Sequence, residues 1–187
     1  MKGIMKKIIS TLVITTITMM CALPAMAQRG RVSPHETVSA VIDGNRITIT
    51  YGRPYTKDSR SGAQRKIWGT LVPYGQPWRM GADEATILLT QKAIQIGDKT
   101  IPAGAYTLYM NPSETGTSQL VFSSALGGWG IPVDTKHDVA QVDLTKESLD
   151  PPLDQFVMAV SRNSSGGGLI KLSWENTAYS VAFTNAK

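Results

Sequence analysis

Residues 38–51 have the sequence VSAVIDGNRITITY, in which apolar and polar side chains alternate on both sides of a turn. Apolar residues occupy every second position from Val38 to Ile42 and again beyond the Asp43-Gly44-Asn45 turn, up to Tyr51. The turn has the residue types that tight hairpin turns prefer. Because successive side chains of a strand point to opposite faces of a sheet, the pattern predicts a β-hairpin with one buried face.

The same alternation recurs along most of the chain, and no long helical pattern interrupts it. Ser61–Trp68 is the nearest helical candidate and is expected to form one or two turns at most. Gly166–Gly168 is expected to be a hairpin turn. Further strands are expected at Ala85–Thr90, Ala93–Ile96, Tyr106–Met110, Gln119–Ser123, Val139–Leu144, Phe156–Val160, Ile170–Trp174 and Tyr179–Phe183. Their inward aromatic residues are expected in the core: Phe156, Trp174, Tyr179 and Phe183. About ten short strands predict an all-β fold, an antiparallel, jelly-roll-like β-sandwich with one long ordered loop.

The first 27 residues have the pattern of a cleaved signal peptide. A basic start with three lysines precedes an uncharged, mostly apolar span, and Ala25-Met26-Ala27 offers small residues at a cleavage site. We therefore expect residues 1–27 to be removed and residues 28–187 to form a single β-sandwich domain. No second apolar run of membrane-spanning length follows. The expected location is the periplasm or the outside of the cell.

The composition of residues 28–187 excludes several classes of protein. This part carries 16 basic and 14 acidic side chains, a balance that does not indicate a nucleic-acid binder. The only cysteine, Cys21, lies in the predicted leader. Disulfides, thiolate metal sites and a cysteine nucleophile are therefore excluded from residues 28–187.

The alternation stops over the 36 residues from Tyr51 to Thr86, and residues 52–86 of this stretch are the main candidate for function. Loops of this length are uncommon in compact domains and tend to be functional or disordered. Disorder fits poorly, because the 36 residues contain five of the chain's 13 aromatic residues. Basic side chains outnumber acidic ones there by six to three. We expect the segment to fold onto the sandwich and to present arginines, which suit a carboxylate, phosphate or sulfate.

Five residues of the 52–86 segment are the predicted ligand-binding residues: Arg53, Trp78, Arg79, Asp83 and Glu84. Aromatic faces there could stack on sugar rings or pack under the arginine planes. The alternative is structural: Arg53 or Arg79 would pair with Asp83 or Glu84 and tie the segment to the sheet.

Several spaced motifs make the chain similar to a bacterial family. It resembles the exported domain-of-unknown-function family 2911 at Tyr51–Pro54, Arg65–Gly69, Leu71–Gly75, Trp78–Thr86, Ile101–Leu108 and Gly128–Gly130. The resemblance covers nearly all of residues 28–187 and carries over no activity, substrate or catalytic residue. One departure follows Gly130: family members often have an aromatic residue before the next acid, whereas this chain has Ile131-Pro132-Val133-Asp134.

Catalytic and metal patterns are weak. Asp134, His137 and Asp138 lie close together and His35 could join them, but no His-x-His or His-x-x-x-His spacing occurs. No Gly-x-Ser-x-Gly motif supports a serine nucleophile. We expect no catalytic residues, no metal and no cofactor. Asp83 and Glu84, as neighbours on an extended segment, are expected to point to opposite faces.

Three functions remain open from the sequence. The first is a non-catalytic binding module that holds a small polar or anionic ligand, or a cell-envelope partner, through the 52–86 segment. The second is an envelope-directed hydrolase that uses Asp83 or Glu84 as acid or base, with Arg79 fixing an anionic group. The third is a structural envelope protein without a small ligand, in which Arg53, Arg79 and Asp83 form a buried network.

Overall fold

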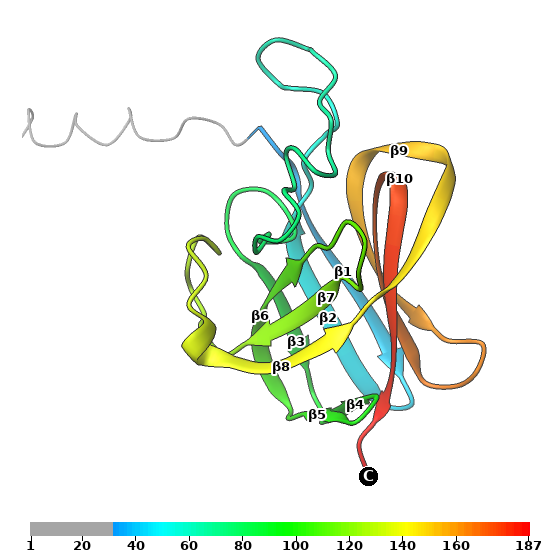
Figure 1. Cartoon of the computed structure of the whole chain (residues 1–187). Helices are drawn as coiled ribbons and strands as arrows, with labels where there is room; N and C mark the ends of the chain where they lie inside the picture. Colours follow the sequence, from blue (N-terminus) through cyan, green and yellow to red (C-terminus); the bar gives the residue numbers. More distant parts are fainter. Residues whose placement is uncertain (1–31) are drawn as a thin grey trace, which may run out of the picture. The chain divides into compact units, whose positions relative to one another are not determined.

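The structure is a computed structural model that describes residues 32–187, and these form one unit. The predicted leader and its cleavage site lie outside the described residues. Within residues 32–187, two antiparallel sheets face each other, which confirms the expected all-β sandwich (Figure 1). The strands are β1 (His35–Ile42), β2 (Asn45–Gly52), β3 (Thr86–Thr90), β4 (Ile94–Ile96), β5 (Lys99–Ile101), β6 (Gly104–Asn111), β7 (Gln119–Ser123), β8 (Asp138–Asp143), β9 (Thr145–Arg162) and β10 (Gly168–Asn185).

The strand order is β1-β2-β3-β6-β7-β8 in the larger sheet and β5-β4-β10-β9 in the smaller one. Among the described residues the only helical element is a 3-10 turn at Thr135–His137, and Ser61–Trp68 forms no helix. No helix of residues 32–187 has the length and apolar character needed to cross a membrane.

The β1–β2 hairpin forms at the predicted positions. Ile42 pairs with Asn45 across the turn, where Asp43 and Gly44 both adopt positive φ, 50° and 74°. This conformation matches the right-handed twist of the two strands. The apolar residues of the alternation face the core, and Ile42, Ile47, Ile49 and Tyr51 are all buried.

Asn45 is fully buried at the start of β2 and links three parts of the chain. Its Oδ1 accepts hydrogen bonds from the backbone N–H of Gln91 (3.1 Å) and of Lys92 (2.9 Å). Its Nδ2 donates to the Thr90 hydroxyl (3.0 Å) and to Oδ1 of Asn185 (2.9 Å). One amide thereby joins the turn after β3 and the end of β10 to the first hairpin.

The chain passes from the larger sheet to the smaller one without a loop. β8 ends at Asp143, β9 begins at Thr145, and the buried Leu144 lies between them. β9 and β10 each have 18 residues, so the expectation of short strands is wrong for this pair. The first part of β9 was missed because its residues are mostly exposed and include Pro151 and Pro152, so they show no alternation. Proline is tolerated there because β9 is an edge strand.

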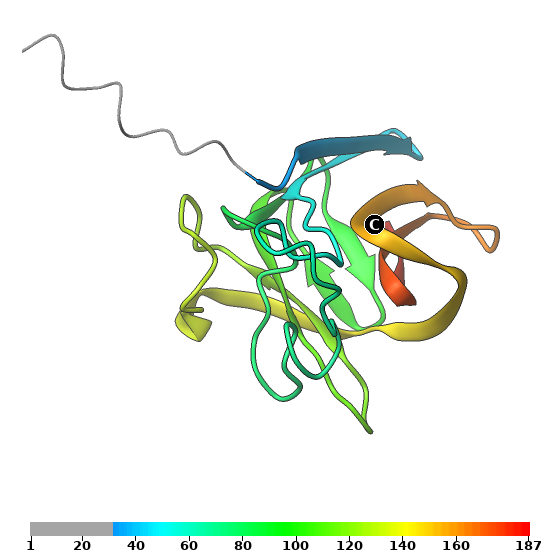
Figure 2. The same ribbon diagram turned by 90° about the horizontal axis from the view of Figure 1, so that it is seen from above.

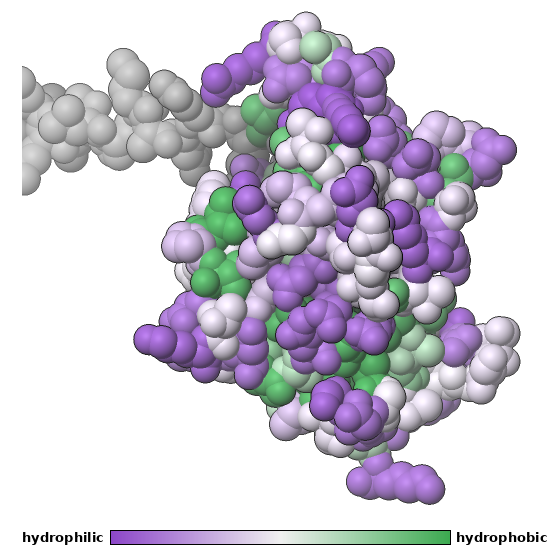
Figure 3. Space-filling view, in the orientation of Figure 1, coloured by the Kyte–Doolittle hydropathy of each residue, from purple (hydrophilic) through white to green (hydrophobic). Residues whose placement is uncertain are grey.

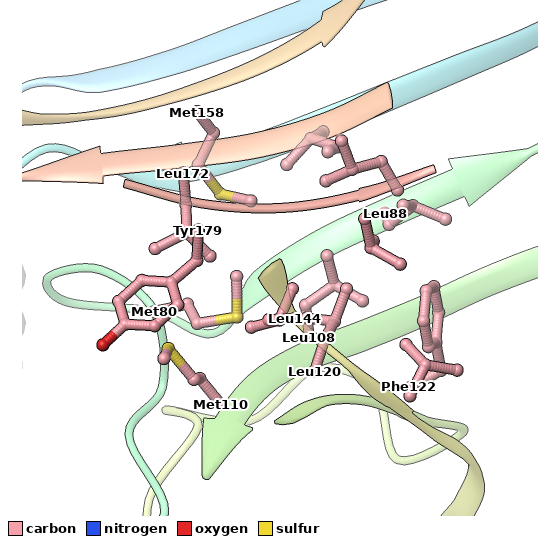
Figure 4. Packing of buried hydrophobic residues seen from close by; sticks show 14 of the residues in the cluster. Met80, Leu88, Leu108, Met110, Leu120, Phe122, Leu144, Met158, Leu172 and Tyr179 are labelled. Atoms are coloured by element: carbon pink, nitrogen blue, oxygen red, sulfur yellow. The ribbon is translucent and has the colours of Figure 1, made fainter. Parts of the chain in front are cut away.

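One core lies between the sheets, and the long segment contributes to it. The four aromatic residues expected in the core, Phe156, Trp174, Tyr179 and Phe183, are at most 2% exposed. Met80, which belongs to the 52–86 segment, is also fully buried. Figure 4 shows it among core side chains of both sheets, including Leu108 from β6 and Leu172 from β10.

Tyr51 gives a pH-dependent prediction for the stability of this core. Its hydroxyl donates to Glu36 Oε2 (2.9 Å) and accepts from the backbone N–H of Met158 (2.9 Å). Burial raises the pKa of Tyr51 from 10.0 to about 12, and the carboxylate of Glu36 adds to the rise. The stabilisation from the neutral phenol is therefore complete below pH 10 and is lost as the pH rises toward about 12.

We expect the difference in unfolding free energy between the wild type and Tyr51→Phe to shrink by about 1 kcal/mol from about pH 9 to about pH 11. Urea unfolding at several pH values measures this difference. The other tyrosines remain in both proteins, so their titration cancels. A difference that stays constant over this range would contradict the prediction.

Candidate functional site

The 52–86 segment, called the long loop below, closes one end of the sandwich. Seen from above, it lies over the end of the two sheets (Figure 2). Its Trp68 and Trp78 are buried against three residues of the smaller sheet, Phe156, Trp174 and Tyr179. These five residues are called the aromatic cluster. The ordering of this loop by its aromatic residues was predicted from their density in the sequence.

Ring contacts hold the aromatic cluster together. Trp78 stacks on Trp174 with ring centroids 5.9 Å apart and meets Phe156 edge to face at 5.3 Å. Trp68 packs on Tyr179 at 5.2 Å, and its Nε1–H donates to the carbonyl of Trp174 (3.3 Å). Each such ring pair adds about 0.5–1.5 kcal/mol to the stabilisation from area burial alone. The long loop is thus part of the core at this end.

Backbone contacts fix both the middle and the return of the long loop. Trp78 and Met110 exchange two backbone hydrogen bonds of 2.7 and 2.8 Å. Where the loop returns to β3, the Ala82 N–H donates to the Gly52 carbonyl (3.3 Å). A Cβ on Gly52 would lie 2.1 Å from the Ala82 carbonyl oxygen, so only glycine permits this approach.

A cleft of about 500 Å³ opens beside the loop. This volume is in the range of small-molecule sites. Trp78 and Trp174 contribute to its wall from the aromatic cluster. Its basic lining residues are Lys57, Arg65 and Arg79, and no acidic residue lines it among residues 32–187.

The local contacts orient the charged groups around this cleft. Arg65 donates through Nε to the carbonyl of Thr56 (3.4 Å) and through Nη2 to that of Tyr55. Asp58, next to Lys57 in sequence, does not line the cleft and caps the loop tip. Hydrogen bonds from the N–H and hydroxyl of Ser61 and the N–H of Arg60 keep the pKa of Asp58 below its ordinary value. Within residues 32–187, none of the three lining cations forms an ion pair with a carboxylate.

Arg79 connects the cleft to a second loop, residues 124–137 between β7 and β8, called the Trp129 loop. The guanidinium lies over the Trp129 ring, 5.7 Å from its centroid, and Nη1 donates to the Trp129 carbonyl (3.3 Å). Gly130 has φ 81°, and a Cβ there would lie 3.0 Å from the Arg79 Cβ. The Ala85 N–H donates to the Gly128 carbonyl (3.3 Å). These contacts give the Gly128-Trp129-Gly130 motif a physical role, because they seat Trp129 on the long loop.

Arg53 has a structural position outside the cleft. Its Nη1 lies 3.0 Å from Oε2 of Glu36 on β1, and its Nε donates to the carbonyl of Phe156 on β9 (3.2 Å). It therefore ties the end of β2 to both sheets. Within residues 32–187, Arg53 pairs with Glu36 and Arg79 with the Trp129 carbonyl, whereas Asp83 and Glu84 both lie near His35, which differs from the structural alternative expected from the sequence. Because these partners are separate, Arg53, Arg79 and Asp83 do not form one buried network among the described residues.

Asp83 and Glu84 do not point to opposite faces, so this expectation is wrong. The Nε2 atom of His35 lies 3.1 Å from Oε2 of Glu84 and 3.9 Å from Oδ2 of Asp83. The reason is local: Asp83 has φ 63°, so the segment turns there and is not extended. Neither carboxylate lines the cleft.

The histidines and acids considered for a metal have separate partners. His35 faces Asp83 and Glu84, whereas His137 Nε2 lies 3.6 Å from Asp134 Oδ2. Asp138 accepts a hydrogen bond of 2.6 Å from the Tyr109 hydroxyl. In the part of the chain that the structure describes, no three His, Cys, Asp or Glu side chains are arranged to hold a metal ion.

Of the five predicted residues, the structure places two in the cleft, Trp78 and Arg79. Arg53, Asp83 and Glu84 lie outside it. The sequence also missed lining residues. Lys57 and Arg65 were counted only in the basic surplus, and Trp174 only in the core. Ile131 lines the cleft from the Trp129 loop, and only the unusual Ile131-Pro132 sequence after Gly130 marked that position.

A search of curated proteins and a search of solved structures each gave no match. A family model described as "Protein of unknown function (DUF2911)" matches residues 33–183. These residues include both sheets, the long loop and the Trp129 loop. The family resemblance inferred from the motifs is confirmed, and the chain belongs to this family of proteins of unknown function, DUF2911.

Proposed function

We propose that this protein is an exported, non-catalytic binding module that holds a small organic anion in the cleft beside the long loop. The observation that carries the proposal is the charge of the lining: Lys57, Arg65 and Arg79 line the cleft, and no described acidic residue does. These three cations share one lining and form no ion pair with a carboxylate of residues 32–187, so a bound carboxylate, phosphate or sulfate would neutralise their charge. The arginines supply the planar donors that such groups accept. The leader pattern of residues 1–27 supports export.

The site is built from rigid parts, which suits binding. Trp78 is held by ring contacts and by two backbone hydrogen bonds, and Arg79 follows it directly. Arg65 is anchored by two carbonyl oxygens. Side chains held in this way lose little additional freedom when a ligand arrives, which lowers the entropic cost of binding.

A thermal-shift screen of the purified protein against short carboxylates, phosphates and sulfates tests the proposal. A ligand present at a hundred times its dissociation constant adds about 2.7 kcal/mol, which raises Tm by several degrees. Arg79→Gln and Lys57→Gln are each expected to weaken binding of the hit about tenfold. The matched control is Lys99→Gln, which removes one positive charge from β5 at the end of the sandwich opposite the long loop (Figure 1). An equal loss of affinity in the Lys99→Gln control, or no stabilisation by any anion, would overturn the proposal.

The hydrolase alternative is less well supported. It needs Asp83 or Glu84 beside a substrate that Arg79 holds, yet neither carboxylate lines the cleft that Arg79 lines. Both face His35 instead. The structural alternative without a ligand predicts a silent screen, so the same experiment separates it from the binding module.

A further inference from the structure

The mouth of the cleft carries exposed apolar side chains. Four large hydrophobic residues that are more than a third exposed contribute to its lining: Val32, Tyr55, Leu71 and Ile131. They come from three separate parts of the chain, so their gathering is a property of the fold. In Figure 3, hydrophobic patches lie at the left of the view, beside the Trp129 loop, while hydrophilic side chains cover the tip of the long loop at the top. Apolar and basic side chains thus meet at one cleft.

Trp129 lies against Arg79 beside this cleft, although it is not one of the cleft's lining residues. Trp129 is 54% exposed, although its carbonyl accepts a hydrogen bond from Arg79 and its neighbours Gly128 and Gly130 pack on the long loop. The cation of Arg79 covers one part of the indole, and Arg79 itself lines the cleft. A large aromatic ring that is held by its backbone and still exposed favours contact with an apolar part of a ligand.

From this arrangement we infer that the bound anion is an amphiphile, a single molecule with a carboxylate or phosphate head and an alkyl chain. The head would lie against Lys57, Arg65 and Arg79, and the chain against Leu71 and Ile131, all of which line the same cleft. The inference rests on the proposed function, because it names the class of anion for the same cleft. A single molecule is favoured over a lipid surface because the cleft encloses about 500 Å³, a volume typical of small-molecule sites.

The chemistry predicts a dependence on chain length that a purely ionic site would not show. Each methylene that becomes buried strengthens binding about fourfold. Calorimetric titration with acetate, butyrate, hexanoate and octanoate, all below micelle formation, should give Kd values that fall along the series. The total fall from butyrate to octanoate is expected to be at least about tenfold. Octanol, which has the chain and no charge, should bind at least about tenfold more weakly than octanoate.

A double variant of the apolar lining tests the position of the chain. The double variant Leu71→Ser, Ile131→Ser should weaken the binding of octanoate about tenfold and leave the binding of butyrate unchanged. Leu89→Ser is the matched control, because Leu89 is similarly exposed (43%) and is absent from the cleft lining. Arg79→Gln should weaken the binding of octanoate and of butyrate by the same factor.

The possible outcomes separate the inference from the proposed function. If acetate and inorganic phosphate bind as tightly as octanoate, the amphiphile inference fails while the anion-binding function stands. If no anion binds, both fail. If octanol binds as tightly as octanoate, the site is apolar and the requirement for an anionic head group is wrong. Binding to phosphatidylglycerol vesicles without binding of octanoate would assign the cleft to a lipid surface and would also overturn the inference.

Discussion

Replacing Trp174 with alanine is expected to lower the free energy of unfolding by about 3–5 kcal/mol, because it removes the residue that joins the aromatic cluster. Trp174 is 1% exposed, stacks on Trp78, meets Phe156 edge to face at 5.8 Å and accepts a hydrogen bond from Trp68 through its carbonyl. Loss of the indole leaves a cavity between the long loop and β10. For a domain of this size the change corresponds to a fall in Tm of roughly 6–20 °C.

Urea and thermal unfolding measure this effect, and the chain provides a matched control. Trp129→Ala makes the same chemical change at a residue that is 54% exposed, so we expect it to lower the free energy of unfolding by about 1 kcal/mol or less. The free-energy cost of Trp174→Phe should lie between the costs of Trp174→Ala and Trp129→Ala. Trp174→Phe keeps a ring in the cluster and removes an indole Nε1–H that is buried without a hydrogen-bond partner among residues 32–187. Equal costs for Trp174→Ala and Trp129→Ala would show that the long loop does not depend on this cluster.

The second large effect is expected at Asn45. Asn45→Ala should lower the free energy of unfolding by about 3 kcal/mol, because it leaves buried polar groups without partners. The backbone N–H groups of Gln91 and Lys92 lose their acceptor, and the Thr90 hydroxyl and the Asn185 side chain lose their donor. Asn176→Ala is the control, since Asn176 is exposed and, among residues 32–187, its side chain only accepts a hydrogen bond from the hydroxyl of its neighbour Thr177.

A double-mutant cycle with Thr90→Val sharpens the test. Residues that share a hydrogen-bond network usually show coupling of about 0.5–3 kcal/mol. We expect the double variant Asn45→Ala, Thr90→Val to be more stable than the sum of the two single changes implies, because both changes remove members of the same network. Strict additivity, or a cost for Asn45→Ala no larger than for Asn176→Ala, would contradict the role assigned to Asn45.

The β1–β2 hairpin was predicted from its alternation, because one face of it is buried. β7 (Gln119–Ser123) was also predicted at its observed position, although Leu120–Ser123 are all buried. The three-residue β5 was missed because only Ile101 of its residues is buried, so it shows no alternation. The early part of β9 was missed for the same reason. Alternation marks a strand only where water and core lie on opposite sides of it, whereas a fully buried strand such as β7 shows a short apolar run instead.

The candidate site could be predicted only in part, because it depends on contacts between distant segments. The aromatic density of the 52–86 segment indicated an ordered loop, and its arginines indicated anion binding. Nothing local places Trp129 over Arg79, since 50 residues separate them. Asp83 and Glu84 were misplaced because Asp83 adopts a positive φ, next to Ala82, whose N–H donates to the Gly52 carbonyl. Asp83 tolerates this conformation, but its sequence context did not require it.

The passage from β8 to β9 through the single residue Leu144 has a mechanical consequence. A strand that continues from one sheet into the other leaves no slack at that corner, so the two sheets cannot slide or hinge apart there without breaking backbone pairing. Any change in the width of the cleft must therefore come from the long loop and the Trp129 loop. Relaxation measurements should place the motion that accompanies ligand entry in these loops, with β8, β9 and β10 remaining rigid.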